Sequence, residues 1–189
     1  NPGFEGPQTN LCGFGADPVG WTVIGDAGVW RPGEDGQCLN SYPDGPPEGS
    51  QICYTNAGPI SQTLTTNLAA NTQYTLRVEV GRRADCCQQT TYQVQLLAGG
   101  TLLSEDDSLL TLIPGSFRTS TVMFGAAPRH PAIGQPLQIR LIRGTPGQGN
   151  FDHVRLESAP ADCNNNGVLD HIDIAQGAPD TNGNGVPDS

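Results

Sequence analysis

The segment TQYTLRVEV, residues 72–80, alternates between apolar and polar side chains from its third residue onward. The two kinds of side chain fall on opposite faces: Tyr74, Leu76, Val78 and Val80 on one, Thr75, Arg77 and Glu79 on the other. A period of two residues is typical of a half-buried β-strand. The segment therefore predicts a strand with one face against a core.

The chain on both sides of this segment continues the pattern of short strands. Residues 91–98 alternate in the same way, and Gly99-Gly100 then predicts a hairpin turn into 101–104. The other candidate strands are 1–5, 21–24, 29–31, 51–55, 60–65, 118–124, 137–143 and 151–157. About ten short strands separated by Gly/Pro turns predict an all-β antiparallel sandwich. One short helix is expected at 170–176, ended by Gly177.

Five motifs in order are similar to jelly-roll modules of the galactose-binding-like, carbohydrate-binding class. They are NPGFE at 1–5, GWTVI at 20–24, ISQTL at 60–64, YTLRVEVG at 74–81 and FDHVRL at 151–156. The resemblance covers about residues 1–158 and implies a jelly-roll β-sandwich whose first and last strands lie side by side and share a structural calcium ion. Carried onto this chain, it implies Glu5 and Asp152 as ligands; the alternative is that both only cap strand ends.

The last 28 residues carry a second pattern, in which oxygen-bearing residues alternate around a glycine. The first set is Asp162, Asn164, Asn166, Gly167, the Val168 carbonyl, Asp170 and Asp173; the second is Asp180, Asn182, Asn184, Gly185, the Val186 carbonyl and Asp188. Because Ca²⁺ takes six to eight oxygens from a loop curled around it, this spacing predicts two calcium loops. A turn-rich polar tail without metal is the alternative.

This tail resembles dockerin-type and thrombospondin type 3 calcium repeats. The resemblance implies two parts, a jelly-roll sandwich at 1–158 and a dockerin-like calcium-binding segment at 159–189. The second repeat stops before its last ligand, which suggests that an oxygen from elsewhere, in this chain or in another molecule, completes that site.

Charge and cysteine content restrict the partners and the compartment. The formal net charge is −10, and all nine basic residues are arginines. No basic cluster exceeds the Arg82-Arg83 pair, so nucleic acid is not expected as a partner. No apolar run is long enough for membrane insertion.

The six cysteines show no C-x-x-C spacing, so zinc is not expected, and they predict disulfides in an oxidising compartment. The preferred pairs are Cys12 with Cys38 or Cys53, and Cys86 or Cys87 with Cys163. A chain starting at Asn1 without a signal peptide fits a mature extracellular or cell-surface protein, although a boundary placed inside a longer chain would look the same.

No catalytic constellation is recognisable from the residues alone. None of the three histidines lies near a G-x-S-x-G turn, and the acidic run 105–107 is interpreted as a solvated turn. Trp21 is expected in the core, whereas Trp30 and Tyr42, in polar surroundings, are candidate exposed platforms for a sugar.

These observations favour a non-catalytic, extracellular, calcium-binding structural or assembly protein of the surface-layer or filament kind. Its calcium-loaded tail would dock on another copy of the chain or on another extracellular protein. The alternative is a secreted carbohydrate-binding module that binds polysaccharide.

Overall fold

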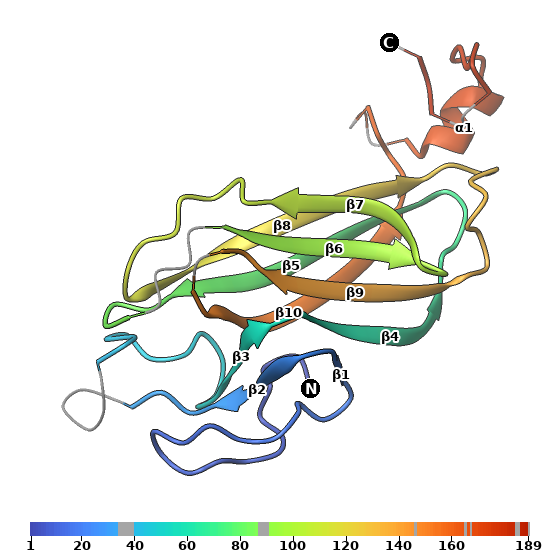
Figure 1. The fold of residues 1–189 in the computed structure, drawn as a ribbon. Helices are drawn as coiled ribbons and strands as arrows, with labels where there is room; N and C mark the ends of the chain where they lie inside the picture. Colours follow the sequence, from blue (N-terminus) through green and yellow to red (C-terminus); the bar gives the residue numbers. More distant parts are fainter. Residues whose placement is uncertain are drawn as a thin grey trace.

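The computed structural model describes residues 1–33, 40–86, 91–145, 147–164, 166, 168–183 and 186–188, which form strands almost throughout (Figure 1). The strands are β1 (Thr22–Val23), β2 (Asp26–Trp30), β3 (Ile52–Ala57), β4 (Pro59–Asn67), β5 (Thr72–Arg82), β6 (Tyr92–Ala98), β7 (Thr101–Asp107), β8 (Ser116–Ala126), β9 (Pro136–Arg143) and β10 (Gly149–Pro160). The helix α1 spans Asp170–Ala175.

The strands form two five-stranded sheets that pack face to face. One sheet has the order β1-β4-β9-β6-β7 and the other β2-β3-β10-β5-β8, with antiparallel pairing between neighbouring strands. Figure 1 shows the α1 segment beyond one end of the sandwich and the β2–β3 region at the other end. The predicted antiparallel β-sandwich of the jelly-roll kind is confirmed.

The core lies between the sheets, and β5 supplies its face as the alternation predicts. Tyr74, Leu76, Val78 and Val80 are at most 2% exposed. Burying an aliphatic side chain of this size contributes about 1.5–3 kcal/mol. Trp21 lies in the same core, as expected from its apolar strand.

A buried hydrogen-bond network ties the two sheets together near β6. The Tyr92 hydroxyl donates to Asp106 Oδ2 over 2.8 Å, and Ser120 Oγ donates to the same oxygen over 2.6 Å. Asp106, expected in a solvated turn, is instead 2% exposed. Tyr92 and Asp106 belong to one sheet and Ser120 to the other, so this carboxylate joins the layers.

The N-terminal residues 1–5 form no strand, contrary to the prediction. Phe4 has a φ of 56°, in the left-handed region, which a strand does not tolerate. The segment still lies against the last strand, because the Val154 N–H donates to the Pro2 carbonyl over 2.9 Å.

The C-terminal end of the sandwich runs further than expected. β10 continues to Pro160, three residues past the predicted end of this strand at 157. The predicted short helix is confirmed as α1, and Gly177 after it has a φ of 104°. The described part of the chain holds no helix long and apolar enough to cross a membrane.

The cysteines differ from the predicted pairing. Cys53 is a buried free thiol, and Cys163 is an exposed free thiol, so the pairs that used them are wrong. Cys12 and Cys86 are each disulfide-bonded, and Cys38 and Cys87 lie outside the described residues. Burial raises the pKa of Cys53 well above its usual value.

Candidate functional site

Five aromatic side chains gather at the β2–β3 end of the sandwich, and we call them the aromatic cluster: Phe14, Trp30, Tyr42, Tyr54 and Phe117. Phe14 stacks on Trp30 with 5.3 Å between centroids and 9° between planes. The Phe14 ring also lies at 85° to the Tyr54 ring, with 4.9 Å between their centroids. Tyr42 bridges Trp30 and Phe117, at 6.1 Å and 4.4 Å. Strand ends and loops far apart in the sequence therefore bring these rings into one contiguous, largely buried group.

Gly81 in β5 makes room for this cluster. A Cβ placed on Gly81 would lie 2.5 Å from the Phe117 ring and 2.7 Å from the Tyr42 hydroxyl oxygen. Both distances are shorter than van der Waals contact, so the close approach of these two rings requires a residue without a side chain.

An ion pair between the buried Arg83 and the exposed Asp85 lies against the cluster. Arg83 donates from Nε and Nη2 to the two carboxylate oxygens of Asp85, over 3.0 Å and 2.6 Å. The guanidinium carbon lies 4.4 Å from the centroid of Trp30. The hydrogen bonds from Arg83 lower the pKa of Asp85 to about 2, so the carboxyl is ionised at neutral pH. The site therefore holds a cation and an anion side by side against an aromatic ring.

Buried amides complete the polar part of the site. The Tyr42 hydroxyl donates to Asn150 Oδ1 over 2.8 Å, and Arg83 Nη1 donates to Gln148 Oε1 over 3.1 Å. Gln148 is 6% exposed and Asn150 is fully buried. Burial raises the pKa of Tyr42 well above its usual value, so its hydroxyl keeps its proton.

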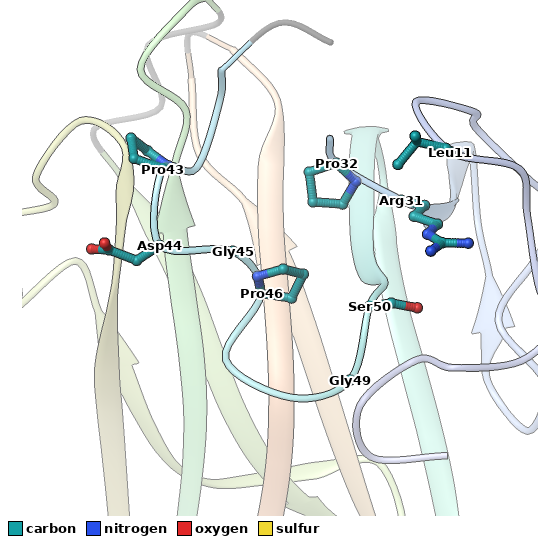
Figure 2. A pocket seen from close by; sticks show the side chains of 9 residues that line it. All are labelled: Leu11, Arg31, Pro32, Pro43, Asp44, Gly45, Pro46, Gly49 and Ser50. Carbon is teal, nitrogen blue, oxygen red and sulfur yellow. The ribbon is translucent and has the colours of Figure 1, made fainter. Parts of the chain in front are cut away.

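An open pocket of about 430 Å³ adjoins the segments that carry Trp30 and Tyr42 (Figure 2). Its lining residues are Leu11, Arg31, Pro32, Pro43, Asp44, Gly45, Pro46, Gly49 and Ser50. In Figure 2 the loop segment 43–46 lies across the pocket from Pro32. The Asp44 carboxylate points away from Pro32. Three prolines make these walls rigid, and the volume falls within the range of small-molecule pockets.

Trp30 and Tyr42 were predicted as exposed platforms, and this prediction is wrong. Trp30 is 3% exposed and Tyr42 is fully buried. The residues that sequence reasoning missed are Arg83, Asp85, Gln148 and Asn150; the Arg82-Arg83 pair was the one visible signal.

Glu5 and Asp152, implied by the resemblance as ligands of a shared calcium ion, lie near a third acid, Glu48. Glu5 Oε1 accepts from the Ser50 N–H over 2.9 Å, and Asp152 Oδ2 accepts from the Glu48 N–H over 3.0 Å. Asp152 is fully buried. Burial, reinforced by the neighbouring carboxylates of Glu48 and Glu5, raises the pKa of Asp152 to about 8. Glu48 Oε2 is buried without a hydrogen-bond partner.

Two glycines leave the space that these acids occupy. A Cβ on Gly3 would lie 2.7 Å from the Glu48 carboxyl carbon, and one on Gly49 would overlap the Glu5 carboxyl group. Among the described residues, no group of three or more His, Cys, Asp or Glu side chains could hold a metal ion by itself. A cation here would therefore take backbone oxygens as well, as Ca²⁺ does.

The first predicted calcium loop is gathered around Asp173. Asn164 Nδ2 and Asn166 Nδ2 donate to Asp173 Oδ2 over 2.9 Å and 2.8 Å, and the Asn166 N–H donates to Asp162 Oδ1 over 3.2 Å. Val168 is tied to the same turn, because its N–H donates to Asn166 Oδ1 over 2.7 Å.

Asp170 plays a different part in that loop. It is 1% exposed, and its Oδ1 accepts from the Cys163 N–H over 2.7 Å. The Asp170 N–H donates to the Ala161 carbonyl over 3.0 Å. Asp170 therefore fastens α1 to the end of β10.

The second predicted loop is gathered at Asp188. Its carboxylate accepts from the Thr181 N–H over 2.7 Å and from Asn182 Nδ2 over 3.1 Å. The Gly183 N–H donates to the Asp180 carbonyl over 3.3 Å. Val186 is described, whereas Asn184 lies outside the described residues.

Comparison with known proteins gives a family. The model of the HpiC1-like family, described as HpiC1 cyclase, matches residues 1–157. The crystal structure of the Stig cyclase Fisc from Fischerella sp. TAU, in complex with (3Z)-3-(1-methyl-2-pyrrolidinylidene)-3H-indole, is 32% identical with a TM-score of 0.76, over 86% of this chain and 96% of that one. A cyclase from the same organism in complex with 4-(1H-indol-3-yl)butan-2-one is 31% identical with a TM-score of 0.73, over 86% and 96%.

More distant structures share the fold alone. The xylan-binding domain of Xyn10C from Paenibacillus barcinonensis is 13% identical with a TM-score of 0.52, over 78% of this chain and 91% of that one. The carbohydrate-binding resemblance is therefore confirmed for the β-sandwich only. No curated protein matches the chain. No comparison supports the resemblance of the tail to calcium repeats, since the family model ends at residue 157.

The match overturns the expectation of a non-catalytic structural or assembly protein. Cyclases are enzymes, so the prediction that the chain is not an enzyme is wrong, and so are the filament-type role and the carbohydrate-binding alternative. The sequence reasoning failed because it searched for nucleophiles and carboxylate pairs, whereas this site is made of aromatic rings, amides and one ion pair. With its first 157 residues matched by the family model, the chain belongs to the HpiC1-like cyclase family.

Proposed function

We propose that this chain is a cyclase that closes a ring on a flat aromatic substrate of the indole type. Its active site would be the aromatic cluster, the Arg83–Asp85 pair and the adjoining pocket. The observation that carries this proposal is that the whole cluster lies within the residues matched by the cyclase family. The relatives with indole compounds bound support the substrate class.

The cluster suits a flat ring because aromatic faces and edges attract one another. Offset or tilted aromatic pairs add about 0.5–1.5 kcal/mol beyond the area they bury. Phe14 is 52% exposed although it stacks on Trp30. It is therefore the member of the cluster that a ligand reaches first.

The charges of the site suit a reaction in which an electron-rich ring becomes positive. Ring closure at an indole carbon places positive charge on the indole in the transition state. Aromatic faces stabilise such a charge, and the ionised Asp85 adds an anion fixed in place by Arg83. The Tyr42 hydroxyl keeps its proton, and its hydrogen bond to Asn150 fixes the position of the Tyr42 ring.

The experiment has two steps, binding and turnover. Calorimetry with 4-(1H-indol-3-yl)butan-2-one measures whether the purified chain binds an indole. An indole carrying a pendent alkene is then incubated with the chain. In this closure the alkene gains a proton, the indole carbon attacks the resulting carbocation, and that ring carbon then loses its proton. One proton is gained and one is lost, so the product has the same mass and a different retention time.

Phe14→Ala is the test variant, and Met123→Ala is its control, since Met123 is 54% exposed on β8 and outside the cluster. We expect Phe14→Ala to weaken binding about tenfold, the loss of roughly one aromatic contact, and Met123→Ala to leave it unchanged. Absence of binding and of turnover in the unaltered chain would refute the proposal.

Calcium enters the proposal at two places. The first is the group of Glu5, Glu48 and Asp152, where a Glu48 oxygen without a hydrogen-bond partner, 3.6 Å from His153 Nε2, supports a cation. The second is the tail, where the first loop is already folded around Asp173. In both, the ion would hold chain segments together and take no part in the ring closure.

An extracellular location also stays a proposal. It is supported by the disulfide-bonded Cys12 and Cys86, because such bonds persist in oxidising compartments.

A further inference from the structure

A chain of hydrogen bonds runs from the buried aromatic cluster to the surface, and every step points the same way. Tyr42 donates to Asn150 Oδ1 over 2.8 Å, and Asn150 Nδ2 donates to Gln148 Oε1 over 3.3 Å. Gln148 Nε2 donates to Asn56 Oδ1 over 3.1 Å, and Asn56 Nδ2 donates to Asp26 Oδ2 over 3.1 Å. The first three side chains are buried and the last two are exposed.

The direction of this chain is fixed by Arg83, which bonds Gln148 in its middle, and by Asp26 at its end. Arg83 can only donate, so the Gln148 atom that faces its Nη1 must be the oxygen. Asp26, as a carboxylate, can only accept. The Gln148 amide is therefore held in one orientation. Its oxygen accepts from Asn150 Nδ2, which leaves Asn150 Oδ1 to accept from the Tyr42 hydroxyl.

Gln148 is the point at which the chain branches. Its Oε1 accepts from Arg83 Nη1 and from Asn150 Nδ2, which uses both acceptor positions of that oxygen. Asp85 holds the other side of the same guanidinium. The guanidinium is thus clamped between one carboxylate and one amide, 4.4 Å from Trp30.

We propose that Gln148 is a positioning residue of this site: its amide oxygen holds the Arg83 guanidinium against Trp30 and, through Asn150, fixes the hydroxyl of Tyr42. It would act on a ligand through these side chains. The role in ligand binding rests on the proposed function, whereas the placement of Arg83 does not.

The experiment compares Gln148→Leu with Gln148→Glu. Leucine removes the acceptor, and glutamate keeps an oxygen for Arg83 and Asn150. Gln138→Leu is the matched control, because Gln138 also accepts from an arginine, Arg140, over 3.5 Å, but in the opposite sheet. Calorimetry with 4-(1H-indol-3-yl)butan-2-one gives the Kd, and thermal unfolding shows whether each variant is folded.

A second readout needs no ligand. With Trp21→Phe in every variant, Trp30 is the remaining tryptophan, so its near-ultraviolet circular dichroism and emission report the arginine beside it. We expect Gln148→Leu to change this signal and to raise Kd about tenfold, as loss of an orienting partner does at other sites. Gln148→Glu should stay within about threefold, and Gln138→Leu should match the parent in both readouts.

Folded Gln148→Leu protein with parental Kd and Trp30 signal would overturn the inference. If Gln148→Leu does not fold, Gln148→Glu decides: retention of both readouts supports the role, and a tenfold loss of affinity overturns it. If the parent does not bind the indole probe, the proposed function fails while the Trp30 signal still decides the role of Gln148.

Discussion

The guanidinium group of Arg83 lies 4.4 Å from the ring centroid of Trp30 while it donates two hydrogen bonds to Asp85. The side chains of Arg83 and Asp85 are 6% and 15% exposed. Arg83 is a buried residue whereas Asp85 as a whole residue is exposed, so removal of Asp85 would leave the Arg83 guanidinium in mostly dry surroundings without its charged partner. The contribution of this pair to the free energy of unfolding can therefore be measured by varying the pH.

We expect this pair to lose its contribution to stability in acid. The pKa of Asp85 is about 2 in the folded chain and 3.8 as the reference for the unfolded one. Because the folded pKa is the lower one, the contribution is complete above pH 3.8 and disappears as the pH falls towards 2. Urea unfolding at a series of pH values measures the slope.

The comparison is Arg83→Met, in which the pKa of Asp85 is no longer lowered. Its free energy of unfolding should be smaller by about 1 kcal/mol at neutral pH, because solvent screens the exposed Asp85, and it should fall less steeply between pH 4 and pH 2 than that of the parent. Equal slopes in parent and variant would contradict the interpretation of this pair.

Tyr92→Phe tests the part of the Asp106 hydrogen-bond network that lies within one sheet. It removes the hydroxyl that donates to Asp106 and accepts from the Leu110 N–H over 3.2 Å. We expect a loss of about 1–3 kcal/mol of unfolding free energy, since a buried donor is left without a partner. Thr121→Ala, an exposed position of β8, is the control and should change stability by less than about 0.5 kcal/mol.

Gly81→Ala tests the space in the aromatic cluster. The added methyl group meets the Phe117 ring and the Tyr42 hydroxyl, and overpacking of this kind costs about 1–3 kcal/mol. We also expect weaker binding of 4-(1H-indol-3-yl)butan-2-one. Gly125→Ala in β8 is the control, because its Cβ would meet only Cys163 Sγ, at 3.8 Å. The same loss of binding in both variants would rule out a local effect.

Calcium should stabilise the sandwich through Glu5 and Asp152. At a hundredfold excess over its Kd, a ligand adds about 2.7 kcal/mol to the unfolding free energy. We expect calcium to raise the melting temperature of the parent and to have less effect on Glu5→Gln. Glu157→Gln removes a surface carboxylate paired with Arg77 and should keep the full response. A parent whose melting temperature is the same in calcium and in chelator would refute this site.

In the tail, Asp173 and Asp170 should respond differently to calcium. Asp173→Ala should abolish the protection that calcium gives residues 162–189 against thermolysin, because two asparagines turn to this carboxylate. Asp170→Ala should speed cleavage with and without calcium, because Asp170 holds the Cys163 N–H. Identical digestion of the parent in calcium and in chelator would show that the tail holds no calcium.

Local periodicity predicted most of the strands because each strand has its own buried face. The alternation of β5 and the hairpin between β6 and β7 are confirmed. Residues 1–5 were misjudged because Phe4 takes a left-handed conformation, which depends on its contacts and not on its neighbours in sequence. Phe4 packs on Trp21, with 5.1 Å between ring centroids.

The site was predictable only in part because its members come from separate segments. Trp30 and Tyr42 were singled out, but as exposed rings, because the polar residues around them hid their burial. Gln148 and Asn150 have no sequence signal, since amides in a Gly-rich stretch resemble ordinary turn residues. Their role depends on partners 65 and 108 residues away in the chain.

Strand β10 contains an irregularity between Asp152 and Arg155, where its pairing with β5 shifts register and His153 has a φ of 47°. Phe151 and Val154 both face the core although they stand three positions apart, with two residues between them. Strict alternation from Phe151 would instead bring His153, Arg155 and Glu157 inward. The bulge therefore offsets the phase of the two halves of the strand, whereas a regular strand with the same residues would turn Arg155 and Glu157 into the interior. Length variation in this family member should accordingly be tolerated in its loops, whereas loss of Arg155, beyond the bulge, would turn Leu156 outward and Glu157 inward.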